Sequence, residues 1–338
     1  MTPRATSDFG YDLPEQAIAQ AAVEPRDSSR LLDADSLTDH RFSDLPGLLA
    51  PGDLVVVNRT RVRRARLLGR KDTGGRVEAL LLSPLGDGRW EALVRPARRI
   101  RPGCRMRFGA IGAEVVEGPT GGRVVLRLDA ADAEAAIAAA GTVPLPPYFK
   151  GELADDDRYQ TVYADRIGSA AAPTAGLHFT RGVLDGLAGR GVRIASVDLE
   201  IGLDTFRPIA TATIEEHAMH TERYRVGEET AAAVSATRSG GGEVVAIGTT
   251  VVRALESAAR LSGEVAACEG ATDLFITPGR RFRVVDRLVT NFHVPGSTLV
   301  VLVAAFMGDR WREAYAAALS RGYRFLSFGD AMIVRRSG

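Results

Sequence analysis

The stretch Glu243-Val-Val-Ala-Ile-Gly-Thr-Thr-Val-Val-Arg-Ala-Leu-Glu256 decides the fold of this chain. Its residues 244–247 are an unbroken apolar run, typical of a strand that is buried on both faces. A glycine and two threonines follow, and apolar residues then recur at helical spacing. We therefore predict a strand over residues 243–247 that passes through a tight turn into a helix over residues 250–261.

Outward from this unit, strand and helix patterns alternate through the second half of the chain. Further strands are predicted at 31–32, 53–57, 192–199, 283–289 and 331–334. Further helices are predicted at 228–239, 297–306 and 310–320. Alternation of this kind favours an α/β fold in which helices cover a largely parallel sheet.

The sequence pattern of residues 62–145 differs from that of the rest of the chain. Short β-rich runs at 77–82, 90–94 and 123–128 are separated by glycine- and proline-containing turns, and an alanine-rich helix follows at 132–140. Closely spaced strands of this kind predict a small β-barrel. We therefore expect an α/β catalytic domain built from residues 1–61 and 146–338, with an inserted β-barrel domain at 62–145.

The composition is that of an ordinary globular protein. The 338 residues are 45% hydrophobic and 25% charged, and the two cysteines, Cys104 and Cys268, are far apart in sequence. This cysteine usage favours a reducing compartment. Met1 to Gly10 lacks the apolar core of a signal peptide. The longest apolar run, Leu299 to Met307, is shorter than the roughly 20 residues of a membrane span. We expect a soluble, cytoplasmic protein that makes no membrane contact.

The net charge of +1 conceals an asymmetry. Residues 51–107 hold 15 Lys and Arg against 5 Asp and Glu, a charge of +10, so the remainder carries −9. A basic segment in an otherwise acidic chain indicates a polyanionic partner. A solvated face of arginine-rich strands explains it equally well, and the sequence leaves both readings open.

Two polar loops follow predicted strands, where ligands of α/β proteins bind. The first is Gly248-Thr-Thr250, in which a threonine N-cap presents amide donors to a carboxylate or phosphate. The second is Thr290-Asn-Phe-His-Val-Pro-Gly-Ser-Thr298, with Asn291 and His293. A plain capped helix and a hydrogen-bonded surface histidine are the simpler explanations of these loops.

Two further stretches carry histidine. His217, His220 and Glu222 are close in sequence, but their spacing fits no standard zinc site, so acid–base work or hydrogen bonding to substrate is favoured over a metal. A structural role for at least one of the two histidines is the simpler alternative. The irregular run Ala172 to Thr180, which contains His178, follows neither helical nor strand periodicity. Phosphate-binding glycine motifs and the nucleophile elbow of α/β hydrolases do not occur.

Taken together, these blocks resemble the S-adenosylmethionine:tRNA ribosyltransferase-isomerases of queuosine biosynthesis over essentially the whole chain. The matching segments are Tyr11 to Pro14, Asp27 to Leu32, Pro51 to Leu54, Asn58, Thr60 to Val62, Ala65 to Leu67, Pro144 to Tyr148, Arg158 to Tyr163, Ala172 to Thr180, His217 to Glu222, Gly248 to Thr250, Thr290 to His293, Tyr323 and Phe328 to Met332.

The resemblance implies a specific reaction. S-adenosylmethionine serves as a ribosyl donor: a base removes a proton from C5′ beside the sulfonium, and ring opening expels adenine. The aminomethyl group of a 7-deazaguanine in tRNA attacks, methionine leaves and an epoxide closes, which gives epoxyqueuosine. S-adenosylmethionine is then a co-substrate, no metal or other cofactor takes part, and the tRNA anticodon arm is the partner of what we expect to be a monomer.

The resemblance also implies the site residues. Candidate catalytic residues are His178, His217, His220, Glu222, His293 and Glu200. Candidate substrate-binding residues are Thr174, Gly176, Asp204, Thr205, Thr249, Thr250, Arg253, Asn291, Arg61 and Arg66. The last two belong to the basic segment, which the resemblance directs toward RNA phosphates.

The chain departs from the family at four positions. Glu200 replaces a histidine and Asp204 a glycine, Val251 follows the threonine pair in place of a serine, and Thr277 stands where a tyrosine is usual. A carboxylate in place of an imidazole changes the acid–base assignment. Two alternatives follow: the same donor chemistry on a small-molecule acceptor, or a non-catalytic protein that binds RNA or nucleosides.

Overall fold

The structure of the protein is a computed structural model that describes residues 3–151, 153, 155–202, 207–262 and 264–337. The chain forms two compact units, one of residues 1–61 with 146–338 and one of residues 62–145. Each unit has a hydrophobic core of its own.

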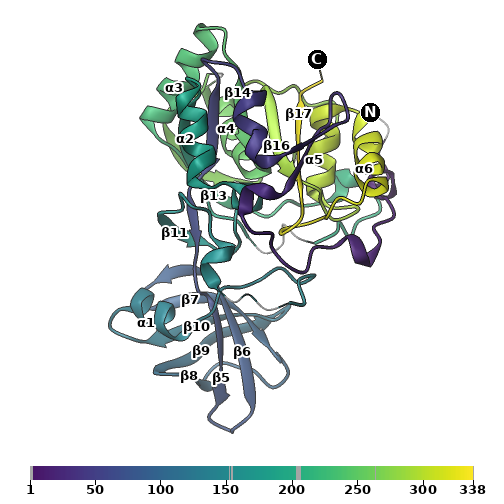
Figure 1. Ribbon diagram of the computed structural model, residues 1–338. Coiled ribbons are helices and arrows are strands. Elements are labelled where there is room, and N and C mark those ends of the chain that lie inside the picture. The colour runs from purple at the N-terminus through teal and green to yellow at the C-terminus, as the bar shows by residue number, and fades with distance from the viewer. Residues whose placement is uncertain (1–2, 152, 154, 203–206, 263, 338) are drawn as a thin grey trace. The chain divides into compact units, whose positions relative to one another are not determined.

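A mixed sheet organises the first unit (Figure 1). Within the described ranges, the nine strands in spatial order are β15 (Cys268–Thr272), β13 (Glu222–Val226), β12 (Arg193–Leu199), β3 (Leu54–Asn58), β14 (Val244–Ile247), β16 (Arg287–Asn291), β17 (Ala331–Arg335), β1 (Arg30–Asp33) and β2 (Thr38–Arg41). A separate two-stranded sheet joins β4 (Thr60–Val62) and β11 (Arg166–Ser169).

The centre of the sheet is parallel. Strands β12, β3, β14 and β16 are parallel neighbours, with Val55 opposite both Ile194 and Val245. Pairings farther out are antiparallel, except that β17 and β1 are parallel. The predicted α/β class with an inserted barrel is confirmed, although the antiparallel edges make the sheet mixed.

Side chains of the central strands point alternately into two cores. Val56 and Ala246 pack among the helices on one face: α3 (Glu228–Ser239), α4 (Thr249–Ser262), α5 (Thr298–Met307) and α6 (Arg310–Ser320). Val55 and Val245 pack on the other face, against α2 (Arg181–Gly189) and two 3₁₀ segments, Phe42–Leu48 and Thr174–His178. Burial on both faces explains why these strands are continuous apolar runs.

One predicted strand is shifted toward the carboxyl terminus of the chain. The sequence pattern places it at 283–289, but β16 spans Arg287–Asn291. The buried carboxylate of Glu256 accepts the N–H groups of Arg283, Val284 and Val285, so these residues bond to a side chain instead of a neighbouring strand. The shift makes Asn291 the last residue of the strand.

The sequence pattern did not indicate α2, β13 or β15. Helix α2 is short, and Thr180 caps it by accepting the N–H of Val183. Strand β13 has the charged residue Glu222 on its buried face, which hides the alternation of apolar and polar residues. None of the described helices combines the length and the apolar character that crossing a membrane requires.

A closed barrel forms the second unit. Its strands, in order around the barrel, are β10 (Arg123–Asp129), β7 (Arg89–Arg95), β6 (Arg76–Gly86), β5 (Arg66–Lys71), β8 (Arg105–Phe108) and β9 (Ile111–Thr120). Alternate residues point inward. Trp90, Phe108 and a set of aliphatic side chains fill the interior together. Helix α1 (Ala133–Ala140) packs Ile137 against this core, with Asp132 as its N-cap.

Candidate active site

The two polar loops meet beyond the carboxyl ends of β14 and β16. They line two small adjoining hollows that share Thr174, Asn291, His293 and Leu299. The volumes are about 30 Å³ and about 20 Å³. We call the two together the polar hollow. Five of the predicted site residues line it: Thr174, Thr249, Thr250, Asn291 and His293.

The amino end of α4 forms one wall of the polar hollow. Gly248 adopts φ +91°, which favours glycine, and α4 begins at Thr249, so that glycine and not a threonine precedes the first helical residue. Both threonines line the polar hollow with Gly248. Among the described residues, the buried Thr250 Oγ1 has no hydrogen-bond partner. A buried hydroxyl of this kind needs a partner, and a ligand in the polar hollow can supply it.

Asn291 anchors the opposite wall. The Thr174 hydroxyl donates to Asn291 Oδ1 at 3.0 Å, and Asn291 Nδ2 donates to His178 Nε2 at 3.1 Å and to the Leu326 carbonyl at 3.3 Å. The amide is thus fixed by three contacts, two from the segment Thr174–His178 and one from Leu326. Fixing it also fixes the Thr174 side chain at the edge of the polar hollow.

His178 lies behind Asn291, outside the polar hollow. Its Nδ1 is 2.8 Å from Ser29 Oγ, and its ring stacks on Phe42 with a centroid separation of 5.0 Å. Both ring nitrogens are therefore engaged within the protein. Burial lowers the pKa of His178 to about 4. A neutral imidazole bonded at both nitrogens braces Asn291, which differs from the proton-handling role that its sequence motif suggested.

His293 is the one predicted histidine among the described residues that line the polar hollow. Its Nε2 is 2.9 Å from Thr290 Oγ1. The backbone around it is held by two tyrosines, since Tyr315 accepts its N–H at 3.2 Å and Tyr11 donates to its carbonyl. Burial lowers the pKa of His293 to about 3, so the ring is neutral at neutral pH.

Two buried neutral histidines make the fold sensitive to acid. Both have folded pKa values below the ordinary 6.5, so the unfolded chain binds more protons as the pH falls below 6.5. Stability is therefore full above pH 6.5 and declines below it. We expect the free energy of unfolding to fall by roughly 2–3 kcal/mol between pH 7.5 and 5.5, measured by urea titration.

A variant tests whether the two buried histidines cause this pH dependence of stability. His293→Gln is expected to retain about half of the pH effect, because one of the two groups no longer titrates. A stability that does not change across this interval in the wild-type protein would contradict neutral, buried histidines.

Glu222 is the centre of a second, separate cluster. Its Oε1 accepts the Gly202 N–H at 2.8 Å and lies 2.9 Å from His220 Nε2, and Arg253 Nη1 bonds to Oε2. Burial opposes ionisation of Glu222, but His220 and Arg253 outweigh it and hold the carboxyl pKa below its ordinary value. Within the described residues, no set of three or more His, Cys, Asp and Glu side chains is arranged to hold a metal ion.

This cluster corrects the role expected for Arg253. The guanidinium is buried and also donates to the carbonyls of Leu274 and Thr272 at 3.1 and 3.3 Å. Arg253 therefore forms an internal ion pair with Glu222 and does not line the polar hollow.

His217, another predicted catalytic residue, is half-buried, with its ring edge-on to Phe275. Burial and then the nearby His220 lower the pKa of His217.

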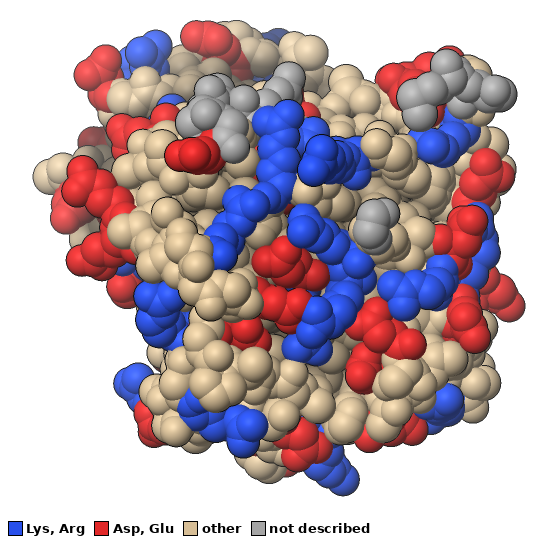
Figure 2. All heavy atoms as spheres, turned by 90° about the horizontal axis from the view of Figure 1, so that it is seen from above, with Lys and Arg blue, Asp and Glu red and all other residues tan. Residues whose placement is uncertain are grey.

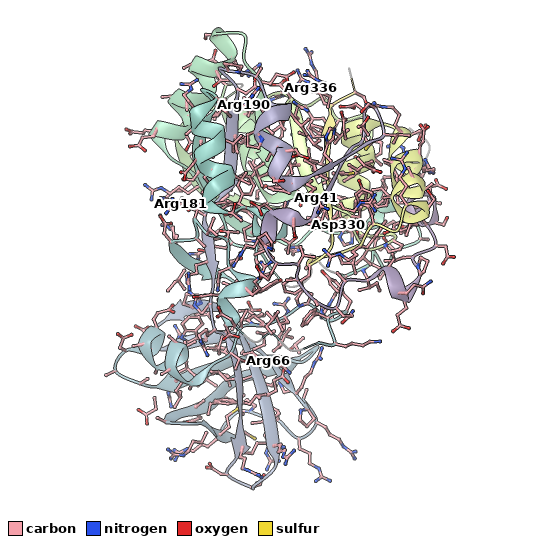
Figure 3. All side chains as sticks on the ribbon, viewed as in Figure 1. Arg41, Arg66, Arg181, Arg190, Asp330 and Arg336 are labelled. Carbon is pink, nitrogen blue, oxygen red and sulfur yellow. The ribbon has the colours of Figure 1, made fainter. Side chains whose placement is uncertain are left out.

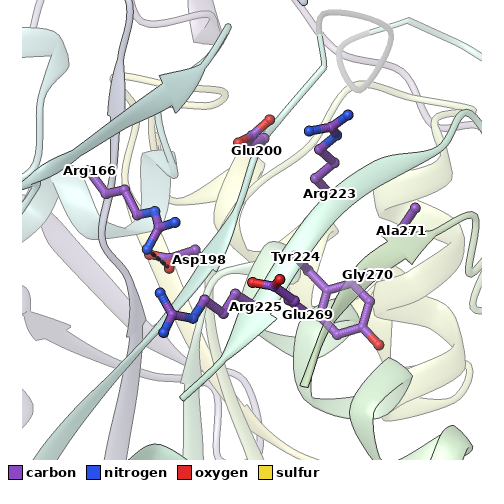
Figure 4. Close-up of a pocket in the computed structure, with 9 residues that line it drawn as sticks. All are labelled: Arg166, Asp198, Glu200, Arg223, Tyr224, Arg225, Glu269, Gly270 and Ala271. Atoms are coloured by element: carbon purple, nitrogen blue, oxygen red, sulfur yellow. Dashed lines mark ion pairs between the residues drawn. The ribbon is translucent and has the colours of Figure 1, made fainter. Parts of the chain in front are cut away.

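Glu200 lines a different and much larger hollow, of about 490 Å³ (Figure 4). We call it the charged hollow. The residues that line it are Arg166, Asp198, Glu200, Arg223, Tyr224, Arg225, Glu269, Gly270 and Ala271. Ile201, the next residue after Glu200, lines the polar hollow. Successive side chains of an extended chain point to opposite sides, so the end of β12 separates the two hollows.

The other predicted residues have different surroundings. Gly176 is a packing position, because a Cβ there would lie 2.1 Å from the Tyr163 hydroxyl. Arg61 bonds to Asp157 at 2.6 Å. Arg66, labelled in Figure 3, makes two bonds to Glu78 on the neighbouring barrel strand, at 3.0 and 3.1 Å. Asp204 and Thr205 lie outside the described residues.

Sequence reasoning gave no role to the partners that hold the site together. Ser29 bonds to His178, and Asp27 accepts the Thr180 hydroxyl at 2.7 Å, so the segment that begins at Asp27 supports the irregular run 172–180. The one available signal was that both segments belong to the family pattern. Their separation by about 150 positions, as in the Ser29–His178 pair, hides the contact.

Comparison with known proteins agrees with these features. The profile of the queuosine biosynthesis protein family matches residues 6–334. A protein named S-adenosylmethionine:tRNA ribosyltransferase-isomerase from Symbiobacterium thermophilum is 52% identical over 337 residues, covering 97% of this chain and 99% of the relative. The protein of the same name from Gloeobacter violaceus is 50% identical over 335 residues, covering 97% and 95%.

A solved structure is also similar. The crystal structure of S-adenosylmethionine tRNA ribosyltransferase from Thermotoga maritima is 37% identical, with a TM-score of 0.56, and the match covers 97% of this chain and 100% of that one. The resemblance inferred from the sequence blocks is thereby confirmed. The chain belongs to the queuosine biosynthesis protein family.

Proposed function

We propose that the protein transfers and isomerises the ribosyl group of S-adenosylmethionine onto 7-aminomethyl-7-deazaguanine in tRNA, which gives epoxyqueuosine and releases adenine and methionine. Near-full-length identity of about half to enzymes named for this reaction supports the proposal. The observation that carries it in this chain is the polar hollow, where the amino end of α4, an unpartnered buried hydroxyl and a neutral histidine converge.

The amino end of α4 suits the methionine carboxylate of the donor. The first N–H groups of a helix have no partner within the helix, and the helix dipole favours an anion beside them. Thr250 Oγ1 adds a further hydrogen-bond donor or acceptor. At about 30 Å³ and 20 Å³ the polar hollow is far smaller than the roughly 300 Å³ of a small-molecule site, so donor binding must widen it.

His293 is the residue that we assign to proton removal at C5′. When its Nε2–H donates to Thr290 Oγ1, the lone pair of Nδ1 is available to accept a proton. The low pKa keeps the ring unprotonated throughout the neutral range. His178 holds Asn291 in place, and Glu222 holds the N–H of Gly202, three residues after β12. We therefore assign both residues to positioning and neither to proton transfer.

The charged hollow is our candidate for the acceptor. Its volume of about 490 Å³ lies within the range of small-molecule sites, roughly 300–1,000 Å³, and suits a modified nucleobase. The Glu200 carboxylate complements the positive charge of an aminomethyl group. Because Glu200 and Ile201 are consecutive and line different hollows, this placement brings the acceptor to the boundary with the donor.

Replacing Glu200 tests this placement. Glu200→Ala is expected to raise KM for tRNA by about tenfold and to lower turnover, because a charge-assisted hydrogen bond is lost. KM for S-adenosylmethionine should stay within twofold. Steady-state kinetics with each substrate varied in turn makes the measurement, and Glu313→Ala, which removes an exposed carboxylate on α6, is the matched control. Unchanged kinetics for Glu200→Ala would contradict a role for this residue.

The barrel is a further candidate RNA surface. Several of its arginines are paired with carboxylates, including Arg66, but Arg98, Arg99 and Arg101 are exposed in the loop between β7 and β8. Contacts between such groups and RNA phosphates position the anticodon arm and make affinity fall with salt. We place the protein in the cytoplasm as a monomer that needs no metal or organic cofactor.

Release of adenine distinguishes the proposal from its alternatives. The protein is incubated with S-adenosylmethionine and with tRNA that carries 7-aminomethyl-7-deazaguanine, and adenine and methionine are quantified. Release that requires this tRNA is the expected result. Release with a small amine in the absence of RNA would favour a small-molecule acceptor. An absence of release under every condition would leave a binding protein.

A further inference from the structure

A cluster of cationic side chains lines a hollow away from both sites described above. Five arginines, Arg238, Arg280, Arg281, Arg283 and Arg336, line a hollow of about 1210 Å³. We call it the arginine hollow. Its other described lining residues are uncharged, so five guanidinium groups face it without a carboxylate among them.

The arginine hollow lies at the amino ends of the central parallel strands. Arg238 is in the last turn of α3, shortly before β14, and residues 278–283 precede β16. Arg336 follows β17, whose Arg335 is paired with Arg287, the first residue of β16. Figure 3 labels Arg336 at this edge, and Figure 2, which looks down on the edge, shows blue side chains there with red ones between them. The polar hollow lies at the opposite edge of the same strands.

Part of this surface is rigidly held. Arg336 donates to the Phe282 carbonyl at 3.0 Å and to Asp286 at 3.1 Å, and Arg4 donates to the Pro278 carbonyl at 2.7 Å. The buried carboxylate of Glu256 fixes the backbone of residues 283–285 by accepting their N–H groups. The exposed side chains of Arg281 and Arg283 are thus carried on a segment with a fixed backbone. A surface with few conformations loses little entropy when it binds a ligand.

The chemistry of the surface indicates its ligand. Guanidinium groups bind phosphate through paired hydrogen bonds. Five of them around one hollow attract anions, even though Arg336 is also paired with Asp286. A single small anion cannot reach arginines spread around about 1210 Å³. A chain of phosphates can reach several of these arginines at once. On the proposed function, the wobble nucleotide sits at the opposite edge, so these phosphates belong to another part of the RNA.

We propose that the arginine hollow binds the sugar–phosphate backbone of tRNA outside the anticodon arm. This inference rests on the proposed function, since it takes the tRNA of that reaction as its ligand. Such contacts carry no sequence information but raise affinity and fix the orientation of the RNA. The protein then recognises a whole tRNA better than an isolated anticodon stem–loop.

The test compares these two RNAs. Arg281→Gln/Arg283→Gln removes two exposed charges, and KM is measured for whole tRNA and for an anticodon stem–loop with the same modified base. We expect KM for whole tRNA to rise by about tenfold or more at 0.1 M salt, and the slope of log affinity against log salt to fall by about 1.8. KM for the stem–loop should change by less than twofold. Arg312→Gln/Arg321→Gln, on and just after α6, removes the same charge from another exposed surface and should leave both values unchanged.

Each outcome has a distinct meaning. An equal rise for both RNAs would overturn the inference, because it would place the contact within the anticodon arm. Unchanged KM values would overturn it too, and a loss of inorganic polyphosphate binding in the same variant would then assign the arginine hollow to a free anion. If the wild-type protein releases no adenine with either RNA, the proposed function itself fails, and that result is separate from any effect of the variants.

Discussion

Replacement of His293 by glutamine is expected to lower kcat by about 10²–10⁴-fold, the usual effect of removing a general base. Glutamine can keep a hydrogen bond to Thr290 but cannot accept the C5′ proton. KM for S-adenosylmethionine should change little, because the amino end of α4 and Thr250 remain. Single-turnover release of adenine makes the measurement without interference from product dissociation.

His217→Gln is the matched control for that variant. His217 is half-buried and lies outside the described lining of the polar hollow, so its replacement should leave kcat within a few-fold. Far-ultraviolet circular dichroism of both variants establishes that they fold. A large loss of turnover in His217→Gln, with normal turnover in His293→Gln, would move the base to His217.

Replacement of Arg253 by methionine is expected to cost about 3–5 kcal/mol of folding free energy, because it leaves the Glu222 carboxylate buried without its cation. Both side chains are buried, with side-chain exposures of 5% and 2%, so water cannot compensate. The variant also leaves the carbonyls of Leu274 and Thr272 without a donor. Urea unfolding at pH 7.5 measures the loss.

The double variant Glu222→Gln/Arg253→Met separates charge from packing. A neutral glutamine can still accept the Gly202 N–H, so the double variant should be more stable than Arg253→Met alone. Arg59→Met, which removes a half-exposed partner of Asp198, should cost about 1 kcal/mol or less. A cost below 1 kcal/mol for Arg253→Met would show that the buried pair is not required.

The sequence predicted the elements whose periodicity is set by burial. Helices over 228–239 and 310–320 begin and end where expected, because their apolar faces and ends are unambiguous. The strand expected at 283–289 is shifted because Glu256, 27 positions away from Arg283, captures its backbone. A pattern of apolar residues contains no information on such a contact.

The sequence likewise predicted the location of some candidate site residues but not the role of others. Thr249, Thr250, Asn291 and His293 come from loops that follow parallel strands, and topology alone brings such loops together. The resemblance assigned Arg253 to substrate binding, yet its contacts point into the protein. The roles of buried polar residues depend on which distant partners satisfy them, and sequence spacing does not supply those partners.

Transfer of the ribosyl carbon from donor to RNA tests the central claim most directly. S-adenosylmethionine labelled either in the ribose or in the methyl group is incubated with the protein and with tRNA carrying 7-aminomethyl-7-deazaguanine. The ribose label should enter the RNA while the methyl label leaves with methionine. Methyl label in the RNA, or RNA without either label while adenine is released, would contradict ribosyl transfer to tRNA.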